Sequence, residues 1–317
     1  MKDRYGREIT YLRLSVTDLC NLRCRYCMPE EGICKKQHQE LLTEEEMIMA
    51  IRAAASIGIH KVRITGGEPL VKKNILSICR QASQVPGIRE LCITTNGILL
   101  PQLAVPLRQA GVDRVNMSLD TLDPEKYGMI TRLGRLEDAL AGLQAALEAG
   151  FQKVKLNAVL IGGFNDDEIP ALAELTLRYP VDVRFIEYMP MPQVQDFGPE
   201  AYLPCDTVLK RLPQLGPVAD RSRVARCYQL PGALGKVGLI SAVTNDFCAG
   251  CNRIRLTSDG KLKPCLHDGQ EIPIKGLTQE QMARQMEKAI LAKPRCHTLL
   301  SPQAHSRAGR TMNTIGG

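Results

Sequence analysis

The sequence lacks several features that would assign it to other classes of protein. It has no tryptophan, and its Tyr and Phe residues are scattered, without the aromatic cluster of an RNA-recognition motif. No apolar run reaches the roughly 18 residues that a membrane-spanning helix needs. The charged residues 1–4 are followed by no apolar stretch of the kind found in a signal peptide. We therefore expect a cytoplasmic protein that binds neither membranes nor nucleic acid.

Two common catalytic motifs are also missing. Only two residues separate Gly232 from Gly235, and no Ser or Thr follows Lys236, so this glycine pair is not a P-loop. The His residues form no HExxH pattern, which argues against a zinc hydrolase. If the protein binds a nucleoside triphosphate, Arg and Lys side chains must hold the phosphates. The net charge of +7 fits a polyphosphate partner, and it fits a mildly basic protein without one equally well.

Cysteine, by contrast, is abundant, with 12 residues. In a reducing compartment we do not expect disulfides, so these residues are candidates for metal ligands, catalytic thiols or small core residues. Half of them have no cluster spacing: Cys34, Cys79, Cys92, Cys205, Cys227 and Cys296. Of these, we expect Cys79 and Cys92 to lie in the core.

The first two thirds of the chain alternate strand-like and helix-like segments. The predicted strands are residues 11–16, 61–65, 90–95, 113–119, 153–161 and 181–188. The predicted helices are 43–57, opened by a capping box of Thr43 and Glu46, and 74–84, 102–110, 135–149 and 167–179. Repeated strand–helix units predict a parallel sheet, either open and doubly wound or an incomplete barrel.

Polar residues at the C-terminal ends of these strands favour the barrel, because barrel enzymes carry their chemistry there. We therefore predict an α/β protein with an incomplete (βα)6 TIM-type barrel over residues 1–203. After that point the rhythm changes to short strands at 236–243, 253–257 and 261–263 and one helix at 279–291. Residues 204–317 are predicted to form a smaller C-terminal domain.

The first cysteine cluster follows the first predicted strand. Cys20, Cys24 and Cys27 have the spacing C-x3-C-x2-C. Three thiolates can hold three irons of a [4Fe–4S] cluster and leave the fourth iron open to another ligand. Cys34 is the nearest further cysteine, but its spacing does not mark it as a ligand. A zinc site would favour two C-x2-C pairs or His partners.

This pattern, with Tyr26 before the last cysteine, resembles the signature of the radical S-adenosylmethionine (SAM) superfamily. Gly66-Gly67-Glu68-Pro69 is similar to the superfamily's GGEP motif, and later positions match its SAM contacts. The resemblance implies that SAM binds the open iron through its amino and carboxylate groups. Glycines at a strand end let the backbone approach a ligand, and Glu68 offers a carboxylate to the amino group. The implied SAM-binding residues are Tyr26, Gly67, Glu68, Ser118 and Met189.

The second cysteine cluster, Cys248, Cys251 and Cys265, has the spacing C-x2-C-x13-C and again offers three ligands. Zinc is the alternative, with His267 as fourth ligand. The gap of two residues between Cys265 and His267 makes joint ligation awkward, so we expect His267 on the surface.

The segment Cys251-Asn252-Arg253-Ile254-Arg255-Leu256 resembles the GTP 3′,8-cyclases of molybdenum cofactor biosynthesis, as does the terminal pair Gly316-Gly317. The resemblance implies a second [4Fe–4S] cluster whose open iron binds guanine. It also implies a tail that reaches into the active site. Arg253 and Arg255 are the implied catalytic residues.

Several basic residues fall on the predicted strands, where they are costly unless they face a polar cavity. The resemblance assigns them to GTP binding, together with Thr94 and the segment after Cys251. The implied GTP-binding residues are Arg13, Lys61, Arg63, Thr94, Lys155, Arg184, Arg253, Ile254 and Arg255.

The implied activity is a lyase reaction that converts GTP to (8S)-3′,8-cyclo-7,8-dihydroguanosine 5′-triphosphate. An unidentified electron donor and a downstream cyclic pyranopterin monophosphate synthase are the implied partners, and the protein is a monomer or homodimer. Two other interpretations stay open: a radical SAM maturase of peptides, and an iron–sulfur carrier or zinc-stabilised binding module. A carrier would need four ligands for each cluster and no SAM site.

Overall fold

The computed structural model describes residues 1–189, 191, 197–219, 224–244, 247–297 and 306–316. Six parallel strands lie side by side in chain order. They are β1 (Tyr11–Ser15), β2 (Lys61–Thr65), β3 (Glu90–Thr95), β4 (Arg114–Ser118), β5 (Lys153–Leu160) and β6 (Val181–Glu187). The prediction of a parallel sheet is confirmed, and each strand lies within one residue of its expected bounds.

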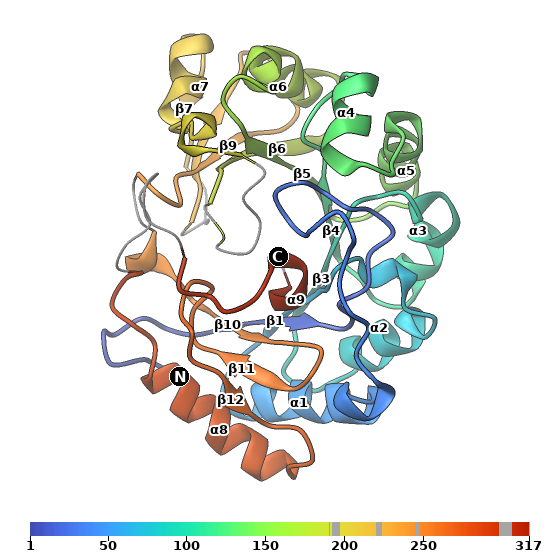
Figure 1. Ribbon diagram of the computed structural model, residues 1–317, viewed down its shortest axis with the longest axis vertical. Helices are drawn as coiled ribbons and strands as arrows, with labels where there is room; N and C mark the ends of the chain where they lie inside the picture. Colours follow the sequence, from blue (N-terminus) through green and yellow to red (C-terminus); the bar gives the residue numbers. More distant parts are fainter. Residues whose placement is uncertain (190, 192–196, 220–223, 245–246, 298–305, 317) are drawn as a thin grey trace.

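The helices that follow these strands cover the outer face of the curved sheet (Figure 1), as in part of a TIM barrel. They are α1 (Glu44–Ser56), α2 (Ile75–Ser83), α3 (Leu100–Gln109), α4 (Pro124–Thr131), α5 (Leu136–Glu148) and α6 (Ile169–Arg178). The capping box at α1 is present, since the Thr43 hydroxyl accepts from Glu46 N at 3.2 Å and Thr43 N donates to the Glu46 carboxylate at 2.9 Å. Helix α4 was not predicted, although Asp123 caps it and Pro124 opens it.

The chain after residue 203 adds strands to both edges of the same sheet. Strand β9 (Val237–Ile240) pairs parallel with β6, and β10 (Arg253–Leu256) pairs parallel with β1. Antiparallel strands continue each edge: β8 (Arg226–Gln229) and β7 (Gly216–Pro217) beyond β9, and β11 (Lys261–Lys263) and β12 (Ile272–Pro273) beyond β10. Within the described residues, the strands before and after residue 203 belong to one sheet. The predicted division into two domains at residue 203 therefore stays a prediction.

Strand alternation decides which side chains face the centre. Arg13 on β1 lies opposite Arg63 on β2 and Arg255 on β10. Their neighbours Leu12 and Ile254 are fully buried in the core between the sheet and the helices. The same core holds Cys79, while Cys92 is also fully buried, which confirms the expectation for both thiols.

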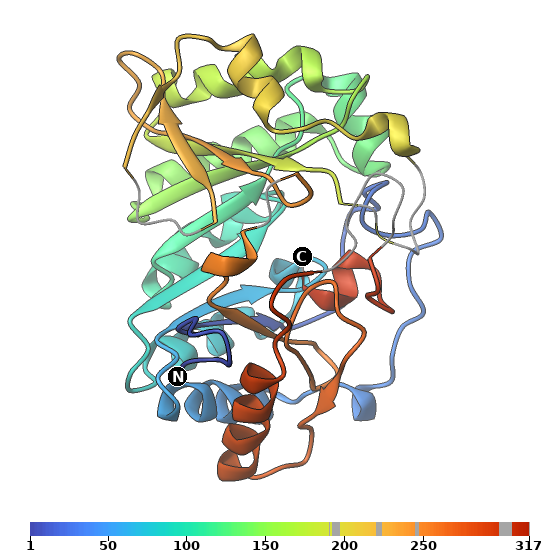
Figure 2. The ribbon, with the colours of Figure 1, turned by 90° about the vertical axis from the view of Figure 1, so that its left-hand side faces the viewer.

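Three further helices lie in the last third of the chain: α7 (Asp206–Arg211), α8 (Gln279–Leu291) and α9 (Met312–Ile315). Helix α8 packs beside α1, and α9 places the C-terminus near the middle of the molecule (Figures 1 and 2). The Arg310 guanidinium anchors this tail through ion pairs with Asp259 at 2.9 Å and Glu271 at 2.5 Å.

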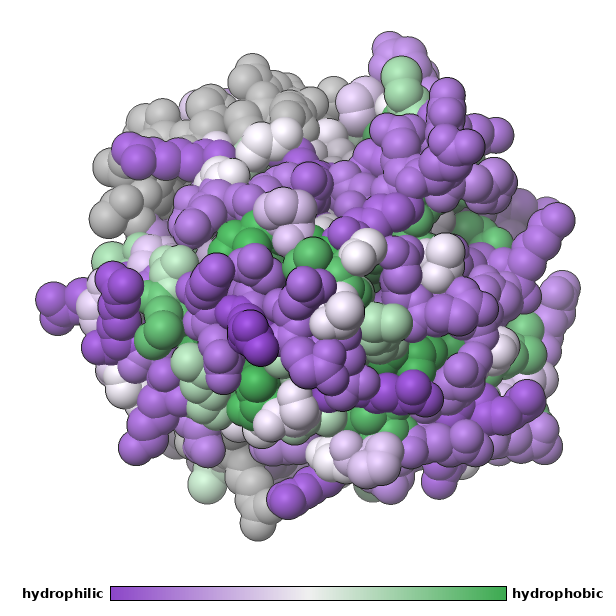
Figure 3. Space-filling view, turned by 90° about the horizontal axis from the view of Figure 1, so that it is seen from below, coloured by the Kyte–Doolittle hydropathy of each residue, from purple (hydrophilic) through white to green (hydrophobic). Residues whose placement is uncertain are grey.

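Seen from below, the surface is mainly hydrophilic, with hydrophobic groups in small separate patches (Figure 3). Among the described helices, none has the length and apolar character needed to cross a bilayer.

Candidate active site

A cavity of about 1110 Å³ lies inside the curved sheet. Its walls bring together all six cysteines of the two clusters and every residue predicted to bind SAM. They also include every residue predicted to bind GTP except Ile254, namely Arg13, Lys61, Arg63, Thr94, Lys155, Arg184, Arg253 and Arg255. The side chain of Ile254 is buried in the core on the opposite face of β10, so only its main chain is left for a contact with GTP. The roles of the other residues stay predictions, but the fold places them together.

The first cysteine triplet lies in the loop after β1. Cys24 O accepts from Cys27 N at 2.9 Å, and the Cys20 thiol accepts from Leu22 N at 3.3 Å. Burial is the main cause that raises the pKa of the Cys20 thiol to about 11 and of the Cys27 thiol to about 12. Bound iron would keep these thiols deprotonated, as metal coordination does in general.

This loop is fixed by the end of α4. Arg23 N donates to Thr131 O at 3.0 Å and Arg25 N donates to Ile130 O at 2.9 Å. Arg132 has a left-handed φ of 62°, and its guanidinium donates back to Arg23 O at 2.8 Å. The cysteine loop is therefore held by main-chain bonds before any cofactor is considered.

Each cysteine triplet offers three thiolates, which can hold three irons of a [4Fe–4S] cluster. Within the described part of the chain, no group of three or more His, Cys, Asp or Glu side chains is arranged to hold a single metal ion. Each triplet supplies only thiolates to the cavity, which is the donor set that such clusters use.

The Glu68 carboxylate is buried and held by three donors beside the first triplet. It accepts from Leu70 N at 2.9 Å, Thr95 Oγ1 at 2.8 Å and Asn96 N at 2.7 Å. Burial raises the pKa of Glu68 to about 7 despite these hydrogen bonds. A carboxylate has about four acceptor positions, so Glu68 can still accept a bond from a ligand amino group.

Glycine is required at positions 66 and 67 by a neighbouring loop. A Cβ atom at Gly66 would lie 2.5 Å from Thr17 O, and one at Gly67 would lie 2.4 Å from Leu19 O. Gly67 N donates to Thr17 O at 2.8 Å and Glu68 N donates to Leu19 O at 2.8 Å. These glycines let the GGEP segment lie against the cysteine loop. Both also line the cavity, and the close approach of a ligand to their backbone stays a prediction.

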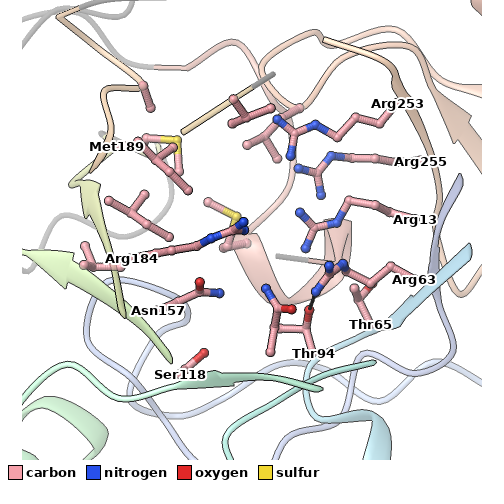
Figure 4. A pocket seen from close by; sticks show the side chains of 18 of the residues that line it. Arg13, Arg63, Thr65, Thr94, Ser118, Asn157, Arg184, Met189, Arg253 and Arg255 are labelled. Carbon is pink, nitrogen blue, oxygen red and sulfur yellow. Dashed lines mark hydrogen bonds between the residues drawn. The ribbon is translucent and has the colours of Figure 1, made fainter. Parts of the chain in front are cut away.

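Tyr26 also lines the cavity, and its hydroxyl donates to Asp120 Oδ2 at 2.7 Å. Asp120 also accepts from Val159 N at 2.8 Å, and burial raises its pKa to about 6. Asn157 lies opposite Ser118 in the β4–β5 register, and among the described residues its side-chain oxygen has no hydrogen-bond donor. Figure 4 shows Ser118, Asn157 and Met189 on one wall of the cavity.

The other wall is a row of arginines (Figure 4). Burial, followed by the charge of Arg255, lowers the pKa of Arg13. Burial, followed by the charge of Arg253, lowers the pKa of Arg255 to about 10. Across the cavity, burial and Arg184 lower the pKa of Lys155 to about 8. Because these cations repel one another in a buried space, the wall favours a polyanion.

Some of the cavity cations have protein partners. Lys61 pairs with Glu90 at 2.8 Å and Lys155 pairs with Asp182 at 2.8 Å. Arg63 donates to Thr94 Oγ1 at 3.1 Å and to the Tyr11 hydroxyl. These bonds orient the side chains without neutralising the arginine row.

The second cysteine triplet lies beside this row. Cys248 is on a short 3₁₀ turn, where Cys251 N donates to Cys248 O at 3.1 Å, and Cys265 follows β11. Burial raises the pKa of the Cys251 thiol, but Lys293 and Arg253 outweigh it and bring the pKa to about 7. No sequence pattern marks Lys293, which lies 28 residues after Cys265 and outside every motif.

His267 lies in the cavity wall, so its expected place on the surface is wrong. A ring nitrogen of His267 lies 3.0 Å from Ser306 Oγ, and the ring packs edge-on against His297 with centroids 5.2 Å apart. Burial, followed by the neighbouring His297, lowers the pKa of His267 to about 3. The β10–β11 hairpin carries this residue inward together with Cys265.

The C-terminal tail reaches the cavity, whose walls include Met312 and Asn313. The Asn313 amide donates to Asp18 O at 3.1 Å, and Arg255 Nη1 donates to Gly316 O at 2.6 Å. Gly316 has a φ of 82°, and a Cβ atom there would lie 2.4 Å from Thr65 Oγ1. Gly316 is thus bonded to an arginine of the cavity wall, while Gly317 lies outside the described residues, so the role of the terminal pair stays a prediction.

Two family models match consecutive parts of the chain. The radical SAM superfamily matches residues 14–176, and the Molybdenum Cofactor Synthesis C family matches residues 181–299. Among solved structures, SuiB of Streptococcus suis bound to S-adenosylmethionine is similar with a TM-score of 0.62 at 17% identity. That similarity covers 84% of this chain and 63% of SuiB. At this identity it supports the fold alone.

Curated relatives match from end to end. A GTP 3′,8-cyclase of Alkaliphilus oremlandii is 49% identical over 100% of both chains. One of Peptoclostridium acidaminophilum is 50% identical over 99% of this chain and 98% of its own. With both family models and full-length relatives in agreement, this chain belongs to the GTP 3′,8-cyclase family within the radical SAM superfamily.

Proposed function

We propose that this protein converts GTP to (8S)-3′,8-cyclo-7,8-dihydroguanosine 5′-triphosphate, the first step of molybdenum cofactor biosynthesis. The observation that carries the proposal is the 49% identity with a GTP 3′,8-cyclase over the whole of both chains. A reduced [4Fe–4S] cluster and SAM, when bound, supply the radical that removes hydrogen from C3′ of GTP. The protein's own residues bind, orient and shield the reactants.

At the first end of the cavity, Cys20, Cys24 and Cys27 would hold three irons. Glu68 would accept a hydrogen bond from the amino group of SAM, and its carboxylate needs no rearrangement because three donors already fix it. Tyr26 and the segment around Gly67 line the same end, with Ser118 and Met189 on the facing wall. Fixed polar groups of this kind orient a cofactor at little cost in reorganisation.

At the other end, the cations would bind the triphosphate. Arg13, Arg63 and Arg255 come from three adjacent strands in register, so their guanidinium groups form one row. A triphosphate relieves their mutual repulsion, and Arg can pair with phosphate oxygens through two parallel bonds. Lys61 on β2, Lys155 on β5 and Arg184 on β6 line the same cavity.

Cys248, Cys251 and Cys265 would hold the second cluster, whose open iron would receive the guanine base. Arg253 and Arg255 lie on β10, just after Cys251, and line the cavity, so they would contact the nucleotide near its reacting end. The tail covers this region through the Arg255–Gly316 bond, which helps to exclude water and oxygen. Holding GTP and SAM in one cavity supplies much of the rate by proximity.

The reaction also needs two protein partners, for which we assign no binding surface. An electron donor must reduce the first cluster, and a cyclic pyranopterin monophosphate synthase would consume the product. A cytoplasmic location would give the enzyme access to GTP and SAM. The oligomeric state is proposed as monomer or homodimer.

An anaerobic reaction of the reconstituted protein with SAM, dithionite and GTP, analysed by mass spectrometry, tests the proposal. We expect 5′-deoxyadenosine together with a cyclised product isomeric with GTP. The same slow formation of 5′-deoxyadenosine with and without GTP would leave radical SAM chemistry in place and refute GTP as the substrate. A peptide-modifying maturase would give that second result.

A further inference from the structure

Lys293 is a buried lysine, and all three N–H donors of its ammonium group have acceptors. It lies two residues after the end of α8, and 4% of its surface is exposed. Nζ donates to Pro264 O at 2.7 Å and to Arg253 O at 2.8 Å, and it lies 3.8 Å from the Cys251 sulfur. A lysine ammonium has three donors, and these contacts account for all of them.

These contacts join the two separate chain segments that carry second-cluster ligands. Arg253 follows Cys251 by two residues, and Pro264 directly precedes Cys265. Because one ammonium group binds both segments, it fixes the separation between the two cysteines. It also brings a positive charge and an N–H donor to the Cys251 sulfur, within the distance of a sulfur hydrogen bond.

The position of Lys293 is set by the core. Lys293 N donates to Ile290 O at 3.2 Å, which continues the end of α8. The buried face of that helix, Met282, Met286, Ala289 and Ile290, belongs to the main hydrophobic core. The ammonium group is therefore mounted on a rigid part of the molecule.

The same segment also reaches the remaining ligand. The Arg7 guanidinium donates to Cys248 O at 2.9 Å, to Arg295 O at 3.0 Å and to Pro294 O at 2.7 Å. Asp3 pairs with Arg7 at 2.6 Å, so this buried charge is compensated. Residues 293–295 thus connect to the main chain around all three cysteines of the second triplet.

We propose that Lys293 is a positioning residue for the second cluster: it sets the spacing of Cys251 and Cys265 and donates an N–H to the Cys251 sulfur. This rests on the proposed second cluster and is independent of which substrate the enzyme uses. The ammonium charge stabilises the reduced cluster, which carries one more electron, so it raises the reduction potential. No signal in the sequence marks Lys293, because its contacts depend on the tertiary fold.

The test compares Lys293→Met with wild type in the full-length, reconstituted holoenzyme without GTP. Iron content, the rate of iron release to a chelator and the midpoint potentials of both clusters are measured, the last by titration followed by electron paramagnetic resonance. We expect faster iron release and about tenfold less reduced second cluster at a fixed potential, a shift of ~59 mV for one electron. The first cluster provides an internal reference whose potential should not move.

Lys288→Met is the matched control, since Lys288 is an exposed lysine on α8, five residues before Lys293. Lys293→Arg keeps the charge and the donors, so it should recover most of the potential even where Lys293→Met loses iron. Unchanged iron release and unchanged potentials in Lys293→Met would overturn the proposal. If Lys293→Met lost iron while the second clusters that remain kept the wild-type midpoint potential, the proposed hydrogen bond from Lys293 to the Cys251 sulfur would be overturned. None of these results depends on cyclisation, so they are separable from failure of the proposed function.

Discussion

The two ends of the cavity carry opposite charges, and without a ligand the charge at each end is not compensated. Around the first triplet, burial raises the pKa of Glu68 to about 7 and of Asp120 to about 6. Around the arginine row, burial and neighbouring cations lower the pKa of Lys155 to about 8 and of Arg255 to about 10. One end favours a cationic ligand and the other a polyanion, which matches the positive sulfonium of SAM and the triphosphate of GTP.

The two triplets are also supported in different ways. Main-chain bonds hold the first, as between Arg23 and Thr131 or Gly67 and Thr17. Buried cations hold the second: Arg7 donates to Cys248 O across a sequence separation of 241, and Lys293 donates to Arg253 O. A bond between two main-chain groups does not depend on the identity of a side chain, whereas support from a buried cation depends on one residue.

The largest effect should come from replacing one cysteine in each triplet. Cys24→Ser should abolish both SAM cleavage and cyclisation, because the first cluster reduces SAM. Cys251→Ser should abolish cyclisation but leave slow SAM cleavage that GTP does not stimulate. Anaerobic assays of 5′-deoxyadenosine and of the cyclised product check this difference. Equal loss of SAM cleavage in both variants would contradict the separation of the two ends, and Cys79→Ser is a control outside both triplets.

A smaller but still large effect is expected from Arg255→Ala. This change removes one member of the arginine row and the bond to Gly316 O. We expect cyclisation to fall by ~10²-fold, about 2.7 kcal/mol of transition-state stabilisation. SAM affinity should stay within about twofold of wild type. Steady-state kinetics and equilibrium SAM binding measure the two effects, with exposed Arg52→Ala as the matched control.

The affinity for GTP should fall as the pH rises. Lys155 binds phosphate only when protonated, and its pKa in the ligand-free cavity is about 8. The protonated fraction therefore declines through this value, which weakens binding about tenfold between pH 7 and pH 9. Equilibrium binding of GTP across this range checks the slope. Lys155→Arg should flatten it, and an unchanged slope in that variant would assign the effect to another group.

Much of this arrangement could be predicted from the sequence. Period-two strands, the capping box at Thr43 and the cysteine spacings depend on neighbours in the chain, so local patterns predict them. The inward direction of Arg13 and Arg63 followed from the cost of burying a charge on a strand. The predicted contact of Ile254 with GTP could not be assigned to its main chain or its side chain, because motif similarity does not separate the two faces of a strand; the fold leaves only the main chain for it.

Other features needed the fold. Strand β9 pairs with β6 and strand β10 pairs with β1, at opposite edges of one sheet. Because the β1–β10 pairing joins segments about 240 residues apart, the sequence does not reveal it, and the change from long strand–helix units to short strands after residue 203 predicts a separate domain instead. The short gap between Cys265 and His267 argues against joint ligation and so predicts a surface position for His267, whereas the β10–β11 hairpin turns it inward. Lys293 and Arg7 act through main-chain oxygens of distant segments, for which sequence spacing carries no information.

The smallest predicted effect concerns SAM and has the opposite sign of pH dependence. Glu68 accepts a hydrogen bond from the SAM amino group best when ionised, and its pKa in the cavity is about 7. Affinity for SAM should therefore decrease as the pH falls, by about threefold between pH 7.5 and pH 6.5. Equilibrium SAM binding in the absence of GTP measures this, and Glu68→Gln should bind more weakly with a flatter profile. The pKa of Glu68 predicts that SAM affinity rises with pH, and the pKa of Lys155 predicts that GTP affinity falls with pH. If both affinities instead changed in the same direction, the opposite charges of the two ends would not govern binding.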